Sequence, residues 1–268
     1  MDMESFPLIA NIDLAGQTLA VRLDRGVSIA IPLDPHGPQP AFFTDEPASA
    51  QPLRSGDYVG DVRLGGTCNA EVIHVVPHCH GTHTECRGHL TRERLNVQET
   101  IYGEPSLAQV VSITPEPGAA DGYPRYGRAA LEDVLRTDLP LGAVVVRTLP
   151  NDPARRSMAY EHAAPYAVFS EDAIAWLASL PLRHLLVDAP SLDPAHDGGR
   201  LQVHRLWWCM AGNPAPEAVD PGRRSATEMI FVPDTVDDGL YWLDLGLSPL
   251  LSDATLSRPT LYPAELTP

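Results

Sequence analysis

Positive charge is scarce in this sequence. The 268 residues include 19 Lys and Arg against 35 Asp and Glu, which gives a formal net charge of −16. An acidic surface repels the phosphates of nucleic acids and the headgroups of anionic lipids. We therefore expect neither nucleic acid nor a membrane as a partner.

Long apolar segments and a leader sequence are also lacking. The opening residues, MDMESFPLIANIDLAG, have neither the basic start nor the long apolar run of a signal peptide. No segment approaches the roughly 18 consecutive apolar residues that a membrane-spanning helix needs. The expected location is therefore the cytoplasm.

Cysteine is rare as well. The four that occur, Cys68, Cys79, Cys86 and Cys209, are too few for the disulfide framework of a chain this long. In a reducing compartment, their expected roles are packing in the core or binding of a metal.

Proline, by contrast, is abundant, with 27 residues. Its clusters at 31–53, 112–124, 149–153 and 214–221 indicate loops or extended arms, because proline interrupts helices and inner strands. The stretch 31–53 is long enough for a linker, a wrapped arm or a loop near the active site. No change of composition divides the chain. We therefore expect one domain over residues 1–268, with residues 1–59 as N-terminal strands and a proline-rich arm or loop.

Strands outnumber helices in the hydrophobic pattern. Helices are predicted for Ala129–Arg136, for a segment that follows the N-cap residue Ser170, and near Val203–Met210. Continuous apolar runs indicate strands that are covered on both faces. Because strands and helices interleave without regular alternation, the expected fold class is α/β with a single mixed sheet. The predicted strands are Thr18–Leu23, Val27–Pro32, Glu71–Val76, Val110–Thr114, Ala143–Thr148, His184–Val187, Met229–Val232 and Leu240–Leu245.

Metal-binding residue types concentrate between Cys79 and His89. Cys79, His83, Glu85 and His89 are separated by four, two and four positions. Since every interval is even, an extended backbone presents all four side chains on one side, whereas a helix scatters them. Gly81 on the same side leaves room for a ligand. The pattern predicts an extended, strand-like edge that binds a divalent metal.

The donor atoms of this segment favour a borderline metal ion. Thiolate and imidazole suit Zn²⁺, and carboxylate with imidazole also accepts Mn²⁺. Four of the ten histidines fall in or beside the segment, at His78, His80, His83 and His89. His80 is the alternative to Cys79 as a ligand, although on a regular strand it faces the opposite side.

The same string resembles the signature of the cyclase family, which includes bacterial kynurenine formamidase and isatin hydrolase. That signature reads His-x-Gly-Thr-His-x-Asp-x-Pro-x-His. The resemblance implies a cyclase-type fold, of the swivelling β/β/α kind, with metal ligands at Cys79, His83 and Glu85. Three positions depart from the signature and mark a divergent subgroup: Cys79 replaces histidine, Glu85 replaces aspartate and Arg87 replaces proline.

Two further blocks carry the resemblance towards the C-terminus. The segment 187–194 resembles the family's Asp-Thr-Pro-Ser-x-Asp block, and His204 falls where the family has a ligand histidine. The family's metal-binding glutamate precedes an apolar strand, which favours Glu228; Glu217 is nearer in spacing but lies among prolines. The resemblance thus implies a set of metal ligands that comprises Cys79, His83, Glu85, His204 and Glu228.

The implied activity is hydrolysis of a formamide, an amide or a cyclic amide by a metal-activated water, with His89 as general acid and base. One or two ions are expected, and Cys79 and Glu85 favour Zn²⁺ over Mn²⁺. Because members of the family are commonly dimers or tetramers, a homodimer or homotetramer is expected. There are two alternatives. One is a non-catalytic relative that keeps the fold and a metal or ligand, and the other is a cysteine hydrolase that uses Cys79 or Cys86.

Overall fold

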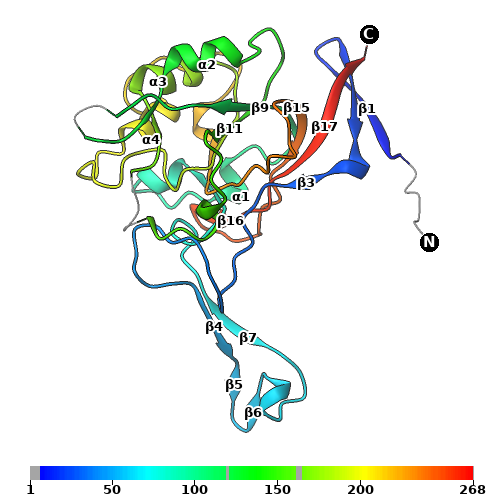
Figure 1. The fold of residues 1–268 in the computed structure, drawn as a ribbon, viewed down its shortest axis with the longest axis vertical. Coiled ribbons are helices and arrows are strands. Elements are labelled where there is room, and N and C mark those ends of the chain that lie inside the picture. The colour runs from blue at the N-terminus through cyan, green and yellow to red at the C-terminus, as the bar shows by residue number, and fades with distance from the viewer. Residues whose placement is uncertain (1–6, 119–120, 161–164, 268) are drawn as a thin grey trace.

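The computed structural model describes residues 7–118, 121–160 and 165–267 (Figure 1). An 11-stranded sheet forms its centre, in the order β1-β2-β17-β15-β9-β11-β13-β14-β8-β16, with β3 paired to β17. The expected mixed sheet with few helices is thus confirmed. The strands of this sheet are β1 (Ile9–Leu14), β2 (Gln17–Arg22), β3 (Val27–Ser28), β8 (His83–Cys86), β9 (Ser106–Ile113), β11 (Ala143–Thr148), β13 (His184–Val187), β14 (Ser225–Glu228), β15 (Gly239–Asp244), β16 (Ala254–Leu256) and β17 (Thr260–Thr267).

The middle of the sheet is parallel and buried on both faces. Strands β9, β11, β13 and β14 run parallel, and β15 and β8 flank them in the antiparallel sense. Successive side chains of β11 point to opposite faces, as in any strand. Val144 therefore belongs to one hydrophobic cluster and Val145 to the other. This arrangement explains the continuous apolar runs in the sequence.

Three helices cover one face of the sheet: α2 (Arg128–Val134), α3 (Glu171–Ser179) and α4 (Gln202–Trp207) (Figure 1). They match the three helices predicted from the sequence, and the Ser170 side chain accepts the N–H of Ala173 as an N-cap. The other face packs against α1 (Val97–Thr100) and the loops around Ile230. No helix within the described ranges is long and apolar enough to cross a membrane. The 3-10 helices are η1 (Leu23–Arg25), η2 (Val62–Leu64), η3 (Arg87–Leu90), η4 (Pro153–Ser157) and η6 (Pro221–Arg223).

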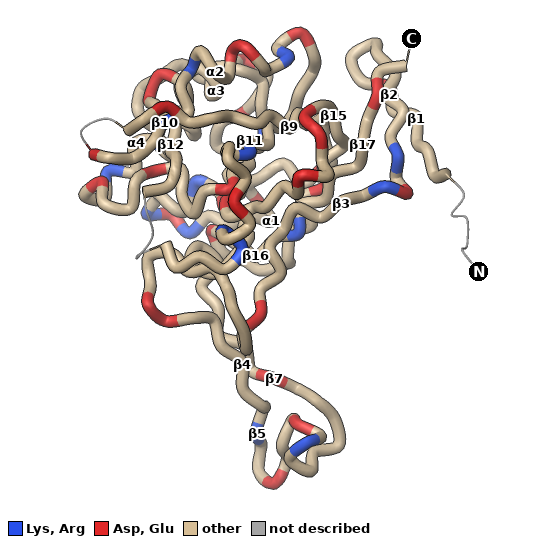
Figure 2. The backbone as a smooth tube through the Cα atoms, viewed as in Figure 1, with Lys and Arg blue, Asp and Glu red and all other residues tan. Residues whose placement is uncertain are grey.

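An arm formed by residues 49–76 projects away from the sheet (Figure 1). It consists of two short antiparallel ribbons, in which β4 (Ser49–Pro52) pairs with β7 (Glu71–His74) and β5 (Arg54–Ser55) with β6 (Tyr58–Val59). The arm therefore begins within the proline-rich stretch and extends well beyond it. Figure 2 shows charges of both signs along it, while acidic residues also occur around the helices and the sheet. The remaining two-stranded sheet pairs β10 (Arg125–Tyr126) with β12 (Val168–Phe169).

Several of the predicted extended segments are wrong in their limits; the strand expected at Val110–Thr114, for example, begins at Ser106. The strand expected at Met229–Val232 lies earlier, at β14, because Met229 has a positive φ of 53° that ends it. The strand expected at Val27–Pro32 ends at Ser28. The extended edge expected from Cys79 to His89 is a strand only over β8, since Gly81 turns the chain with a φ of 92°.

Candidate metal centre

Strand β8 and its neighbour β14 place three acidic or imidazole side chains together. In their antiparallel register His83 lies directly opposite Glu228, so both side chains emerge on the same face of the sheet. The Nε2 atom of His83 is 3.3 Å from Oε2 of Glu228. Glu85 follows two positions after His83 and therefore points to that face as well.

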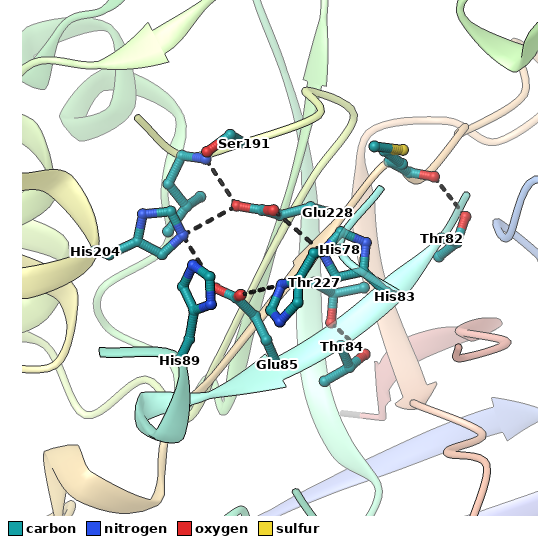
Figure 3. Close-up of polar contacts among 12 residues, drawn as sticks. His78, Thr82, His83, Thr84, Glu85, His89, Ser191, His204, Thr227 and Glu228 are labelled. Carbon is teal, nitrogen blue, oxygen red and sulfur yellow. Dashed lines mark hydrogen bonds and ion pairs between the residues drawn. The ribbon is translucent and has the colours of Figure 1, made fainter. Parts of the chain in front are cut away.

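Helix α4 contributes a second histidine, His204, to the same site. Nε2 of His204 lies 3.0 Å from Oε1 of Glu85 and 3.3 Å from Oε1 of Glu228 (Figure 3). The helix is held there by Asp193, whose carboxylate accepts the backbone N–H groups of Val203 and His204 at the start of the helix. A carboxylate at a helix N-terminus is a stabilising arrangement.

Four atoms at the centre of this group are buried and lack a hydrogen-bond partner within the described part of the chain. They are Nε2 of His83, both carboxylate oxygens of Glu85, and Nε2 of His204. Buried polar atoms are normally paired, because leaving one unpaired costs about 1–3 kcal/mol. A cation between them would satisfy all four. The donor set of imidazole nitrogen and carboxylate oxygen is one that Zn²⁺ or Mn²⁺ accepts, so the residues present fit a divalent metal.

The described residues contain three groups whose ligand atoms lie within 4.8 Å of one another. Two of them share Glu85 and are formed by His78, His83 and Glu85 and by Glu85, His204 and Glu228. The third is formed by His78, His89 and Asp253. Because Glu85 belongs to the first two groups, its two oxygens can serve two neighbouring ions.

Charges within the site shift the titration of its members. Burial opposes ionisation of Glu85, but the imidazoles of His204 and His89 lower the pKa of this carboxyl well below its usual value. Burial likewise opposes a charge on His204, yet Glu85 and Asp193 raise the pKa of this imidazole well above its usual value. The raised pKa of His204 means that its imidazole carries a proton in the absence of metal. A metal bound to this imidazole would displace the proton, so metal binding should release protons.

A pocket of about 530 Å³ gives access to this group. Its wall includes Phe42, Phe43 and residues of the loop 194–201. His89, on η3, lines the pocket beside His204, and their ring centroids are 5.7 Å apart. Glu85, His204 and Glu228 also line the pocket, so a small molecule that enters can reach the candidate metal ligands.

The structure brings together four of the five residues selected as ligands from the sequence, namely His83, Glu85, His204 and Glu228. Cys79 is buried and lines the pocket, but its sulfur belongs to none of the three groups described above. Cys79 was predicted as a ligand because its even spacing from His83 places both side chains on one side of a strand. The strand does not extend to Cys79, because Gly81 turns the chain. His80, the alternative, uses both ring nitrogens in structural contacts, with the N–H of Val76 and the carbonyl of Glu46.

Two residues of the site were missed in the sequence. His78 lies 3.1 Å from Glu85 through Nδ1 and 2.8 Å from Asp253 through Nε2. Asp253 also lies 3.6 Å from Nδ1 of His89. The density of histidines around His83 was a signal for His78, whereas nothing near Asp253 in the sequence marks it.

Several further polar and aromatic residues around the site make structural contacts. Asp188 accepts hydrogen bonds from the backbone N–H of Thr148 and from Arg155, away from the candidate ligands. Trp207 is buried in the core, and Trp208 stacks on the ring of His204 with centroids 5.7 Å apart. Glu217 is exposed in its loop and Arg87 packs against Gly222, so neither faces the pocket.

Comparisons with known proteins agree with this architecture. No curated protein matches the chain. Isatin hydrolase A from Ralstonia solanacearum is 14% identical, with 89% of this chain and 91% of that chain covered and a TM-score of 0.64. A protein from Bacillus stearothermophilus, described as a predicted metal-dependent hydrolase, is 17% identical, with 89% and 98% covered and a TM-score of 0.60. At these identities the likeness establishes the fold. Residues 23–194, more than half of the sequence, match the family model described as "Putative cyclase", and the chain therefore belongs to the cyclase family.

Proposed function

We propose that this protein is a metal-dependent hydrolase that cleaves the carbon–nitrogen bond of a formamide, an amide or a cyclic amide. The observation that carries the proposal is the set of buried, unpaired ligand atoms on His83, Glu85 and His204 at the base of an open pocket. Among proteins of similar fold are isatin hydrolases, and isatin is a cyclic amide. A catalytic metal site keeps a position open for water or substrate, which the pocket allows.

The proposed ligands form two positions that share Glu85. One position takes His83 and Glu85, together with a ligand from the 78–79 segment, and the other takes Glu85, His204 and Glu228. Imidazole and carboxylate donors suit Zn²⁺ or Mn²⁺, and the geometry accommodates one or two ions. A bound divalent ion would acidify a water and polarise the carbonyl group of a substrate.

His89 is the proposed general acid and base. It lines the pocket near His204, and its Nδ1 atom faces Asp253 at 3.6 Å. With one ring nitrogen directed at a carboxylate, the other is left to exchange a proton with a reacting group. His89 would take a proton from the attacking water and return it to the nitrogen that leaves.

The proposal is tested with purified protein loaded with Zn²⁺ or Mn²⁺ and offered aryl formamides, open-chain amides and lactams. We expect turnover of at least one class, and a loss of about 10²–10⁴-fold in kcat for His89→Gln with unchanged metal content. His74→Gln is the matched control, because His74 is an exposed histidine on the arm. Equal turnover by His89→Gln and wild type would exclude the role given to His89.

A fully loaded protein that turns over none of these substrates would favour the second candidate, a relative that keeps the fold but binds a metal or small molecule without catalysis. The open pocket argues against a purely structural zinc site, which is usually closed by four protein ligands. The cysteine-hydrolase alternative is addressed by alkylation: Cys79 acting as a nucleophile reacts in the presence and absence of metal.

A further inference from the structure

Two histidines of the site share one arrangement. His204 directs Nε2 at Glu85, while Nδ1 lies 2.5 Å from Oδ2 of Asp193. His83 directs Nε2 at Glu228, while Nδ1 lies 3.1 Å from the carbonyl oxygen of Gly81. In each ring, one nitrogen faces a carboxylate of the candidate metal site, and the other nitrogen contacts an oxygen atom that lies outside the site. Metal-ligating histidines in proteins are almost always held in this way, because the outer acceptor fixes the tautomer and the ring orientation.

His78 repeats this arrangement with the nitrogens exchanged. Its Nδ1 atom lies 3.1 Å from Oε2 of Glu85 (Figure 3). Its Nε2 atom lies 2.8 Å from Oδ2 of Asp253. Glu85 thus has an imidazole at each oxygen, His204 at Oε1 and His78 at Oε2. Each imidazole has a carboxylate at its outer nitrogen: Asp193 holds His204 and Asp253 holds His78.

The backbone around Asp253 is fixed relative to the strand that carries Glu85. Asp253 immediately precedes β16, which pairs with β8 so that Ala254 lies opposite Glu85. The carbonyl of Asp253 accepts the backbone N–H of Cys86 at 2.9 Å. The carboxylate is therefore fixed relative to the strand that carries Glu85. It also lies near His89, whose ring centroid is 4.3 Å from that of His78.

We propose that His78, through Nδ1, takes the ligand position that the sequence pattern assigns to Cys79, and that Asp253 is the residue that positions it. This inference rests on the proposed function, because it completes the same metal site. It makes the ligand set entirely nitrogen and oxygen. A neutral imidazole in place of a thiolate also leaves more positive charge on the metal, which favours acidification of water.

The ligand identity is tested by the absorption spectrum of the protein loaded with Co²⁺, in which a thiolate ligand produces an intense charge-transfer band in the near ultraviolet. We expect no such band in the wild type, and the same spectrum in Cys79→Ser. A band that disappears in Cys79→Ser would overturn the proposal. This measurement does not depend on how well any variant of His78 folds.

The positioning role is tested by Zn²⁺ affinity, measured by competition with a chromogenic chelator. Loss of an outer partner of a ligating histidine typically costs 10–100-fold in metal affinity. We expect that loss for Asp253→Asn and at least as large a loss for His78→Gln, with Asp57→Asn and His74→Gln on the arm unchanged. Wild-type affinity in both site variants would overturn the proposal while leaving the proposed function intact. A wild-type protein that binds neither Zn²⁺ nor Mn²⁺ would instead refute the proposed function itself.

Discussion

The Oε1 atom of Glu85 lies 3.0 Å from the Nε2 atom of His204, and both atoms are buried without a hydrogen-bond partner among the described residues. Strand β8 and helix α4 are distant in sequence, so the tertiary fold alone creates this contact. Two strong ligand atoms that face each other without a satisfactory hydrogen bond are best explained by an ion that belongs between them.

Glu85 is therefore expected to be the residue on which metal binding depends most. Glu85→Gln should lower the Zn²⁺ affinity by more than about 100-fold, because both candidate positions lose a charged oxygen. Glu85→Asp should have a smaller effect, because it keeps the charged carboxylate. Some loss is still expected, since the shorter side chain withdraws the carboxylate by more than the roughly 0.5 Å that a functional site tolerates. Metal content by elemental analysis, with the surface variant Glu132→Gln as control, checks both. Full metal occupancy in Glu85→Gln would contradict the assignment.

Asp193 is expected to affect both metal binding and stability. Asp193→Asn weakens the hold on Nδ1 of His204 and removes the negative charge at the start of α4. We expect a 10–100-fold lower Zn²⁺ affinity and a loss of about 1 kcal/mol in the free energy of unfolding. Chelator competition and urea denaturation measure the two effects. Asp172→Asn, in the first turn of α3, should lower stability slightly and leave the affinity unchanged.

Much of the fold follows from local pattern. The strand β13 and the helix after Ser170 lie where the apolar runs and the N-cap predict them. The site is harder to predict, because it depends on how the chain turns. His83 and Glu85 share a face because they lie on a true strand, whereas Cys79 was selected by extending that strand through Gly81, where the backbone reverses.

The residues of the site that are far from β8 in the sequence could not be identified from the spacing of residues around His83. Asp253 arrives through the pairing of β16 with β8, and no spacing rule connects it to His78. His204 and Glu228 were selected through the family resemblance, and the structure gives the physical reason, since α4 and the end of β14 meet above β8. The arm was located only in part, because proline marks its beginning but not the strands that form it.

Phe43 is expected to contribute to substrate binding but not to stability. It lines the pocket with 69% of its surface exposed and has a positive φ of 59°, a strained conformation for a bulky residue. Functional residues often carry such strain. Phe43→Gly relieves the strain but adds chain entropy, so the free energy of unfolding should change by less than about 1 kcal/mol.

For a substrate with an apolar group, Phe43→Gly should raise KM several-fold and leave kcat nearly unchanged, since the ring contributes binding that is equal in the ground and transition states. Leu251→Ala, an equally exposed apolar residue that does not line the pocket, is the matched control. A large loss of kcat in Phe43→Gly would show instead that the ring orients the reacting group.

The buried His184 should make the protein less stable in mild acid. Burial, with a smaller effect of Arg183, lowers the pKa of His184 to about 3, whereas an unfolded histidine titrates near 6.5. Between these two pH values the unfolded chain binds a proton that the folded chain does not. The free energy of unfolding must then fall as the pH falls through 6.5, by at most about 1.4 kcal/mol per pH unit.

His184→Asn isolates this contribution, because asparagine does not titrate and can keep a polar contact with Ser225, whose Oγ lies 2.9 Å from Nδ1 of His184. We expect the variant to be less stable than wild type at pH 7.5, and the difference to shrink by about 2 kcal/mol on going to pH 5. Urea denaturation at each pH measures this difference in the free energy of unfolding. The contributions of carboxylates cancel in the difference, because both proteins contain them. His74→Asn, at an exposed histidine of the arm, is the control variant. Parallel pH profiles for wild type and His184→Asn would mean that His184 is protonated in the folded protein, and that Ser225 or a water stabilises its charge.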